Sequence, residues 1–142
     1  MLLSVIIPVY NEELTIGNII DRVTAVVQQT GLKNEVIVVD DCSYDKSLEI
    51  AKKHDAKTYT LKRHLGKGYA LRAGFAQAKG DVVVTIDSDG SHKPEELSLV
   101  LALILQTKQT SSSAQDTFVK KTWLPENLTL LAFNSSTLSS NF

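Results

Sequence analysis

Asp81-Val82-Val83-Val84-Thr85-Ile86-Asp87-Ser88-Asp89-Gly90 is the stretch that best predicts the fold of this chain of 142 residues. Its centre, Val82 to Ile86, is a run of β-branched residues, which is typical of a fully buried strand. The run ends abruptly at two carboxylates. Because the carboxyl ends of parallel strands open onto the crevice where ligands bind, the stretch predicts a buried parallel strand that carries an acidic site.

The two carboxylates, Asp87 and Asp89, stand two residues apart, so in extended backbone their side chains lie on the same face. Two like charges about 4 Å apart repel each other by roughly 4 kcal/mol at an effective dielectric constant of about 20. A bound cation or a shared proton offsets such repulsion. The pair therefore predicts a divalent metal site, with a phosphate as the other partner of the metal.

Alternating strand and helix patterns extend outward from this stretch in both directions. Runs of apolar residues predict buried strands, and apolar residues at three- and four-residue steps predict helices, the first of them capped by Asn11 and lined by Leu14. The strands are expected at residues 2–7, 35–39, 56–61 and 82–86, and the helices at 11–31, 45–53, 69–79 and 94–106. This β-α-β-α-β-α-β-α order predicts an α/β domain with a parallel sheet.

Composition separates this domain, residues 1–106, from the rest of the chain. Residues 107–142 hold seven Ser and six Thr and show little periodicity, so we expect an irregular or disordered tail. Its best candidate for order is the short apolar piece that starts at Leu128. We expect no convincing buried strand after Gln106.

Charge and cysteine content narrow the functional classes. The net charge of −1 gives no electrostatic reason to expect a nucleic acid or an anionic membrane as partner. A single cysteine, Cys42, excludes an internal disulfide framework and fits a reducing compartment. Residues 1–10 lack the basic segment of a signal peptide, and the longest apolar run, 97–105, is too short to cross a bilayer. We expect a cytoplasmic protein, with self-association left open.

Polar residues follow three of the predicted strands and meet at one edge of the sheet. They are Pro8 to Glu12, Asp40-Asp41, and Asp87 to Asp89. A basic loop, residues 62–68, leads into a helix whose N-terminus can face an anion. Tyr10 could stack on a flat ring, and Asp41 could accept a hydrogen bond from a base or a ribose. Together these features predict a nucleotide-diphosphate site.

These motifs resemble a known family. The segments 5–13 (VIIPVYNEE), 36–45 (VIVVDDCSYD), 66–68 (GKG) and 87–89 (DSD) are similar to family 2 glycosyltransferases of the GT-A fold. The segment 89–95 (DGSHKPE) resembles the polyprenyl (dolichol) phosphate mannose or glucose synthase branch. The resemblance covers residues 2 to about 106. It implies a three-layer α/β/α Rossmann-like domain, of which this chain carries the N-terminal, nucleotide-binding half.

The resemblance also implies roles for individual residues. It implies that Asp87 and Asp89 are the catalytic pair that holds Mg²⁺ or Mn²⁺, with Asp89 the direct ligand. The substrate-binding residues that it implies are Pro8, Tyr10, Glu12, Val39, Asp41, Lys67, Asp87, Ser88 and Asp89.

The implied reaction is an inverting transfer of a hexose from a GDP- or UDP-sugar, such as GDP-mannose or UDP-glucose. A polyprenyl phosphate at a membrane surface is a possible acceptor, and its oxygen is already a nucleophile that needs no general base.

Two departures from the family pattern set further expectations. Cys42 stands where the family usually has glycine, which is tolerable if the turn does not need a positive φ. After Gln106 we find no strand followed by the Gly-Ser-Arg-like segment of the family, so the chain is expected to be truncated.

Other interpretations use the same residues. Asp87 and Asp89 also fit the opening motif of haloacid-dehalogenase-type phosphatases, as nucleophile and acid/base. Asp40, Asp41 and Asp87 would fit a receiver domain, although Asp40 also suits a structural role in its loop. A folded but inactive nucleotide-binding fragment is a further alternative. His92 is a weak site candidate.

Overall fold

The computed structural model describes residues 1–110 and 129–131. Within them, one sheet has the strand order β3-β2-β1-β4-β5, and every pair is parallel except β4 with β5. The elements in chain order are β1 (Leu2–Val9), α1 (Ile16–Gln29), β2 (Lys33–Asp40), α2 (Ser47–Lys52), β3 (Lys57–Thr60), α3 (Lys67–Gln77), β4 (Val82–Thr85), the 3-10 turn η1 (Pro94–Glu96), α4 (Leu97–Thr110) and β5 (Thr129–Leu131). The predicted α/β fold with a mostly parallel sheet is confirmed.

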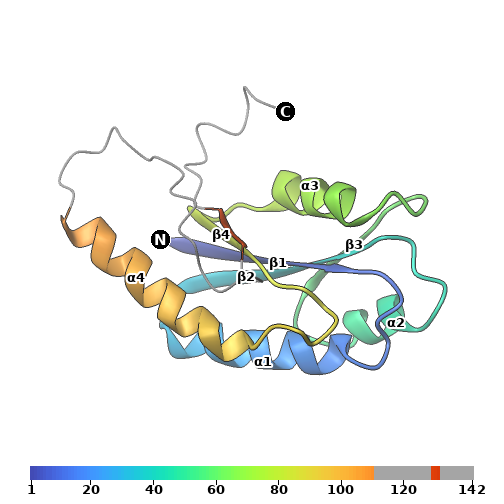
Figure 1. Cartoon of the computed structure of the whole chain (residues 1–142), viewed down its shortest axis with the longest axis horizontal. Helices are drawn as coiled ribbons and strands as arrows, with labels where there is room; N and C mark the ends of the chain where they lie inside the picture. The colour runs from blue at the N-terminus through green and yellow to red at the C-terminus, as the bar shows by residue number, and fades with distance from the viewer. Residues whose placement is uncertain (111–128, 132–142) are drawn as a thin grey trace.

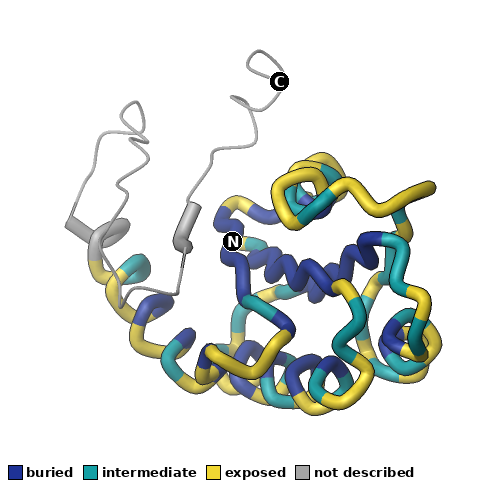
Figure 2. The backbone as a smooth tube through the Cα atoms, turned by 45° about the vertical axis from the view of Figure 1, so that its right-hand side comes forward, coloured by how far each residue is buried: buried dark blue, intermediate teal, exposed yellow. Residues whose placement is uncertain are grey.

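The sheet lies between two helical layers, with α3 on one face and α1, α2 and α4 on the other (Figure 1). Alternate residues of β1 enter the two cores: Val5 and Ile7 pack with α1, whereas Ile6 packs with Ala70 of α3. All three β1 side chains are fully buried. Figure 2 shows the buried strands between helices whose outer surfaces are exposed. The layers are those predicted for a GT-A domain.

The strand order reverses at β1. From β1 the chain moves outward to β2 and β3, and then returns to place β4 on the other side of β1. Ligand sites of open α/β sheets form at such a reversal, beyond the carboxyl ends of the strands. The reversal brings the turn after β4 next to the loop after β1.

Near the amino ends of the strands, away from the turn after β4, the buried residue Glu35 of β2 links this strand to β1 and β3. Its carboxylate accepts hydrogen bonds from Ser4 Oγ at 2.6 Å, Lys57 Nζ at 2.7 Å and the Lys79 N–H at 2.7 Å. Burial alone raises the pKa of Glu35, but these three donors outweigh it and hold the pKa below 4.5. The carboxylate therefore stabilises the fold in its charged form.

The first helix begins later than predicted. It starts at Ile16, not near Asn11, and Leu14 is 93% exposed instead of lining the core. Asn11 has a φ of 52°, outside the helical range, and its side-chain oxygen accepts a hydrogen bond from the Tyr44 N–H. Residues 10–15 form a loop docked on the segment that follows β2, which is incompatible with a helix at Asn11.

The second helix also begins later than its expected start at Asp45, because α2 begins at Ser47 and Lys46 holds the cap position. The Asp45 carboxylate accepts the Ser47 N–H at 2.8 Å. Cys42 has a φ of 62°, so its turn does adopt the left-handed conformation that the sequence left open. A cysteine there carries the strain that glycine avoids.

The chain after Gln106 also differs from the prediction. Helix α4 continues to Thr110, and β5 pairs antiparallel with β4 through Val84 and Leu130. The short apolar piece that starts at Leu128, the expected candidate for order in this segment, therefore does contain a strand. The rest of the predicted tail lies outside the described residues.

Candidate functional site

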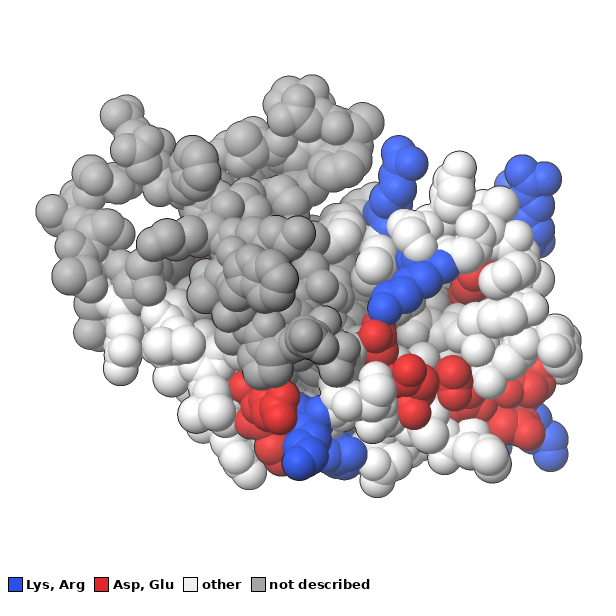
Figure 3. Space-filling view, viewed as in Figure 1, with Lys and Arg blue, Asp and Glu red and all other residues white. Residues whose placement is uncertain are grey.

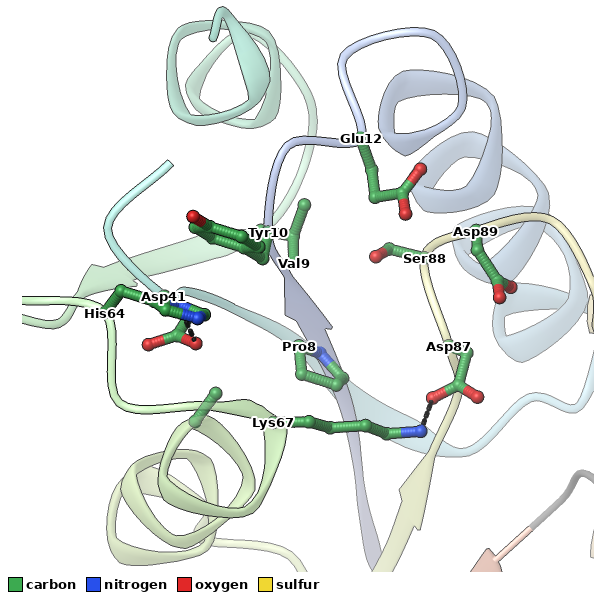
Figure 4. A pocket seen from close by; sticks show the side chains of 11 residues that line it. Pro8, Val9, Tyr10, Glu12, Asp41, His64, Lys67, Asp87, Ser88 and Asp89 are labelled. Atoms are coloured by element: carbon green, nitrogen blue, oxygen red, sulfur yellow. Dashed lines mark ion pairs between the residues drawn. The ribbon is translucent and has the colours of Figure 1, made fainter. Parts of the chain in front are cut away.

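A pocket of about 250 Å³ opens at the carboxyl ends of β1, β2 and β4. It is lined by Pro8, Val9, Tyr10, Glu12, Asp41, His64, Lys67, Ala70, Asp87, Ser88 and Asp89. Figure 4 shows Ser88 pointing toward the β1 segment, Lys67 reaching across from α3 to Asp87, and Asp89 pointing to the other side of the turn. On the side of the molecule where the strands end, acidic and basic side chains lie next to each other (Figure 3). The structure thus brings together three segments that the sequence predicted to converge.

Lys67 and Asp87 form an ion pair across the pocket through Nζ and Oδ1. The Asp87 side chain is 29% exposed and that of Lys67 is 58% exposed, so both are reachable by a ligand. Lys67 is the first residue of α3, and Gly66, with a φ of 97°, turns the chain into that helix. The ammonium group offsets part of the negative charge that Asp87 and Asp89 concentrate at the end of β4.

The turn after β4 is held by its own hydroxyl groups and by α1. Ser91 donates to Asp89 Oδ1 from its hydroxyl at 2.5 Å and from its N–H at 2.9 Å, and these bonds lower the pKa of Asp89 below 3.8. The hydroxyl of Thr15 donates to the Ser88 carbonyl at 2.6 Å. The start of α1 therefore fixes the turn that presents the two aspartates.

Asp41 is almost fully engaged in holding the loop between β3 and α3. Its carboxylate accepts the N–H groups of Leu65 and Gly66, both at 2.8 Å, and lies 2.8 Å from His64 Nδ1. The anion at the N-terminus of α3 is thus a side chain of the protein itself. A carboxylate has about four acceptor positions. Three of them are thus in use, and the Asp41 side chain is only 3% exposed.

His64 is an exposed residue that also lines the pocket, although the sequence did not mark it as a site residue. Its ring stacks on Tyr10, with centroids 3.9 Å apart and planes at 20°. Tyr10 therefore already stacks on a flat ring, that of His64, and its expected stack on a ring of a ligand stays a prediction. The signal available in the sequence was the position of His64 inside the basic loop, beside residues already chosen for the site.

The loops after β1 and β2 are hydrogen-bonded to each other along one wall of the pocket. Asp40 adds a bond within the second loop, where its carboxylate accepts the Ser43 N–H. Five bonds cross between the loops: Asn11 N–H to Ser43 Oγ, Glu12 N–H to Ser47 Oγ, Glu13 N–H to Asp45 Oδ2, Tyr44 N–H to Asn11 Oδ1, and Lys46 N–H to Glu13 Oε2.

Val39 lies apart from the other predicted site residues. Its side chain is fully buried and packs with Ile6, Ile37 and Ala70 beneath the pocket. Its side chain therefore does not line the pocket, and the predicted contact of Val39 with a nucleotide stays a prediction. The sequence could not show this, because Val39 is the last apolar residue of β2 and both faces of that strand are covered.

The two aspartates fit a metal ion that is bound jointly by carboxylates of the protein and oxygens of a diphosphate. Among residues 1–110 and 129–131, no group of three or more His, Cys, Asp or Glu side chains could hold a metal alone. Mg²⁺ sites of nucleotide enzymes typically use one or two carboxylates together with phosphate oxygens and water. The donor set of Asp87 and Asp89 is of this kind.

The fold and pocket define a Rossmann-like α/β domain with a paired-aspartate site at the carboxyl edge of its parallel sheet. The model of the family described as glycosyl transferase family 2 matches residues 4–135. The chain therefore belongs to family 2 of the glycosyltransferases. The match passes residue 106, where we expected the resemblance to end, and it excludes the phosphatase and receiver interpretations of the aspartates.

Two curated relatives carry the name undecaprenyl-phosphate 4-deoxy-4-formamido-L-arabinose transferase. The protein from Aeromonas hydrophila is 37% identical over 131 residues, which are 85% of this chain and 40% of the relative. That from Pectobacterium carotovorum is 44% identical over 101 residues, or 66% of this chain and 31% of the relative. The chain thus spans less than half the length of the curated relatives it matches.

Two solved structures are similar in fold. Mannosyl-3-phosphoglycerate synthase from Rubrobacter xylanophilus has a TM-score of 0.66 and 29% identity, covering 75% of this chain and 36% of its own. Glucosyl-3-phosphoglycerate synthase from Mycobacterium tuberculosis, solved with Mn²⁺, UDP and glucosyl-3-phosphoglycerate, has a TM-score of 0.63 and 33% identity, covering 72% and 39%. In the described part of this chain, no helix has the length and apolarity needed to cross a membrane.

Proposed function

We propose that this chain binds a nucleoside diphosphate sugar and serves a glycosyl transfer with inversion to a phosphate-bearing acceptor. The observation that carries the proposal is that one pocket has Tyr10 and Asp41 at one end and Asp87, Asp89 and Lys67 at the other. A flat base, a sugar ring and two phosphates need aromatic and polar groups at one end and cationic or metal-binding groups at the other.

A uridine diphosphate sugar is the donor we favour, with GDP-mannose as the alternative. The Mycobacterium tuberculosis neighbour was solved with Mn²⁺ and UDP-glucose, at 33% identity to this chain. Asp87 and Asp89 would hold Mg²⁺ or Mn²⁺, which supplies positive charge that stabilises the leaving diphosphate. Lys67 would donate to phosphate oxygens as it now donates to Asp87.

The acceptor we propose is a polyprenyl phosphate, because the names of the curated relatives include undecaprenyl phosphate, a member of this class. Its phosphate oxygen attacks the anomeric carbon of the sugar while the bond from that carbon to the diphosphate oxygen breaks. The bonding electron pair leaves on the nucleoside diphosphate. A single displacement inverts the anomeric centre, and the ionised acceptor requires no general base.

Calorimetric titration of the full chain with UDP and with GDP, in Mn²⁺ and in EDTA, tests the donor half of the proposal. We expect binding of UDP in Mn²⁺ only. Asp89→Asn should weaken it at least about tenfold, or about 1.4 kcal/mol. Asp55→Asn, which removes an exposed charge outside the pocket, should leave it within about twofold.

Failure of a folded sample to bind either nucleotide would refute the proposal. Binding without transfer of labelled sugar to undecaprenyl phosphate would instead identify the chain as a nucleotide-sugar-binding fragment. Tighter binding of GDP than of UDP would replace the favoured donor with GDP-mannose.

A further inference from the structure

A buried imidazole lies directly behind the first aspartate of the pair. His92 is 6% exposed, and its Nδ1 accepts the backbone N–H of Asp87 at 3.1 Å. Because Nδ1 accepts, the ring carries its proton on Nε2. His92 thus has one nitrogen committed to the backbone of Asp87 and one N–H still to be used.

That second nitrogen is buried and has no hydrogen-bond partner among the described residues. An acceptor nevertheless lies close, since Asp87 Oδ2 is 3.8 Å from Nε2, just beyond hydrogen-bonding distance. The other oxygen of the same carboxylate, Oδ1, is held by Lys67 on the opposite side. The Asp87 carboxylate is therefore drawn toward Lys67 and stops short of His92.

We propose that His92 is a positioning residue that receives the Asp87 carboxylate when Asp87 exchanges Lys67 for a divalent metal. In that state Nε2–H would donate to Oδ2, so one ring would hold both the backbone and the carboxylate of the same residue. Hydrogen-bonded partners of this kind orient metal-binding carboxylates and typically change metal affinity about 10- to 100-fold. The inference rests on the proposed function, because it requires that Asp87 bind a metal.

A purely structural role would use only Nδ1, which anchors the turn between β4 and η1. The two roles can be separated because asparagine and glutamine each reproduce one nitrogen. The oxygen of Asn overlays Nδ1 and keeps the bond to the Asp87 N–H, but offers no donor at Nε2. The amide of Gln extends to the Nε2 position and can donate to Asp87 Oδ2.

The test compares His92→Asn and His92→Gln with wild type and with His54→Asn, a control histidine paired with Asp21 outside the pocket. Mn²⁺ affinity is measured by electron paramagnetic resonance at saturating UDP, and stability by urea unfolding in EDTA. We expect His92→Asn to unfold near wild type but to bind Mn²⁺ about 10- to 100-fold more weakly. His92→Gln should be less stable and yet bind Mn²⁺ within about threefold of wild type.

Wild-type Mn²⁺ affinity in His92→Asn would overturn the inference, as would equal losses in the two variants. The wild type gives an independent test by nuclear magnetic resonance. Addition of Mg²⁺ with UDP should shift the Nε2 proton of His92 downfield and slow its exchange with water, and an unchanged signal would also refute the inference. Failure of wild type to bind Mn²⁺ with UDP at all would contradict the proposed function itself.

Discussion

Helix α3 approaches the sheet closely at Gly74. A Cβ added there would lie 2.5 Å from Ile6 Cγ2 and 3.3 Å from both Ile6 Cδ1 and Val39 Cγ2. Ile6 and Val39 are fully buried and β-branched, so their methyl groups have little freedom to move aside. Gly74→Ala must therefore push α3 away from the sheet or strain the core.

The magnitude follows from two opposing effects. Alanine gains about 1 kcal/mol over glycine inside a helix. Overpacking a filled core costs about 1–3 kcal/mol, and a contact shorter than 3.0 Å to a buried branched side chain falls at the upper end of that range. We expect Gly74→Ala to lower the free energy of unfolding by about 2 kcal/mol.

Urea unfolding followed by circular dichroism measures this difference. With a slope of about 1–3 kcal/mol per molar urea, the midpoint should fall by about 1 M. Gly68→Ala is the matched control, because it lies in the same helix with no atom within 4 Å of the added Cβ. The control should be as stable as wild type or more stable, by up to about 1 kcal/mol.

An unfolding midpoint of Gly74→Ala equal to or above that of wild type would refute the reasoning. It would mean that α3 does not rest on Ile6 at the distance described. The position of Lys67 in the pocket would then lose its support, since α3 carries this side chain toward Asp87.

Three further changes test other parts of the molecule. Cys42→Gly should raise the free energy of unfolding by about 0.5–1 kcal/mol, because it relieves a left-handed turn, whereas Cys42→Ala should not stabilise in urea unfolding. Glu35→Gln should lower the free energy of unfolding most at pH 7. The folded-state pKa of Glu35 lies below 4.5, so the charged carboxylate stabilises the fold fully above pH 4.5, and this stabilisation disappears as the pH falls through the folded-state pKa. Urea midpoints of wild type and variant that stay equally far apart at pH 7 and pH 3 would contradict this. Lys67→Met should bind Mn²⁺ alone about two- to tenfold more tightly, because a competing cation is removed, and should bind UDP in Mn²⁺ more weakly. In calorimetric titrations, unchanged or weaker Mn²⁺ binding would contradict the first role, and unchanged or tighter UDP binding would contradict the second.

The alternation of strands and helices was predictable because burial on both faces of a parallel sheet imposes nearly continuous apolar runs. Val82 to Thr85 form β4 as expected. The convergence of Asp41 with Asp87 followed from topology alone, since parallel strands end at the same edge. Local patterns and chain direction were sufficient for these parts.

Features set by contacts between distant segments were not predictable in this way. Asn11 is a residue type that often caps helices, but its side-chain oxygen accepts a hydrogen bond from the N–H of Tyr44, 33 residues away in the chain. The helix therefore begins further along, at Ile16. The role of His64 depends on a stack with Tyr10 and on the carboxylate of Asp41. Strand β5 is only three residues long, too short for a recognisable strand pattern in the sequence, and it is defined by its pairing with the distant strand β4.

The wall formed by the loops after β1 and β2 has a consequence for the order of events in binding. Five hydrogen bonds hold that wall before any ligand arrives, whereas the opposite end of the pocket is closed by the single ion pair of Lys67 with Asp87. If the chain binds a nucleotide sugar as proposed, we expect the nucleoside to dock first on the preformed wall and the phosphates to separate Lys67 from Asp87 afterwards. For that order of events we expect stopped-flow traces with a fast phase whose rate rises with ligand concentration and a slower phase whose rate levels off.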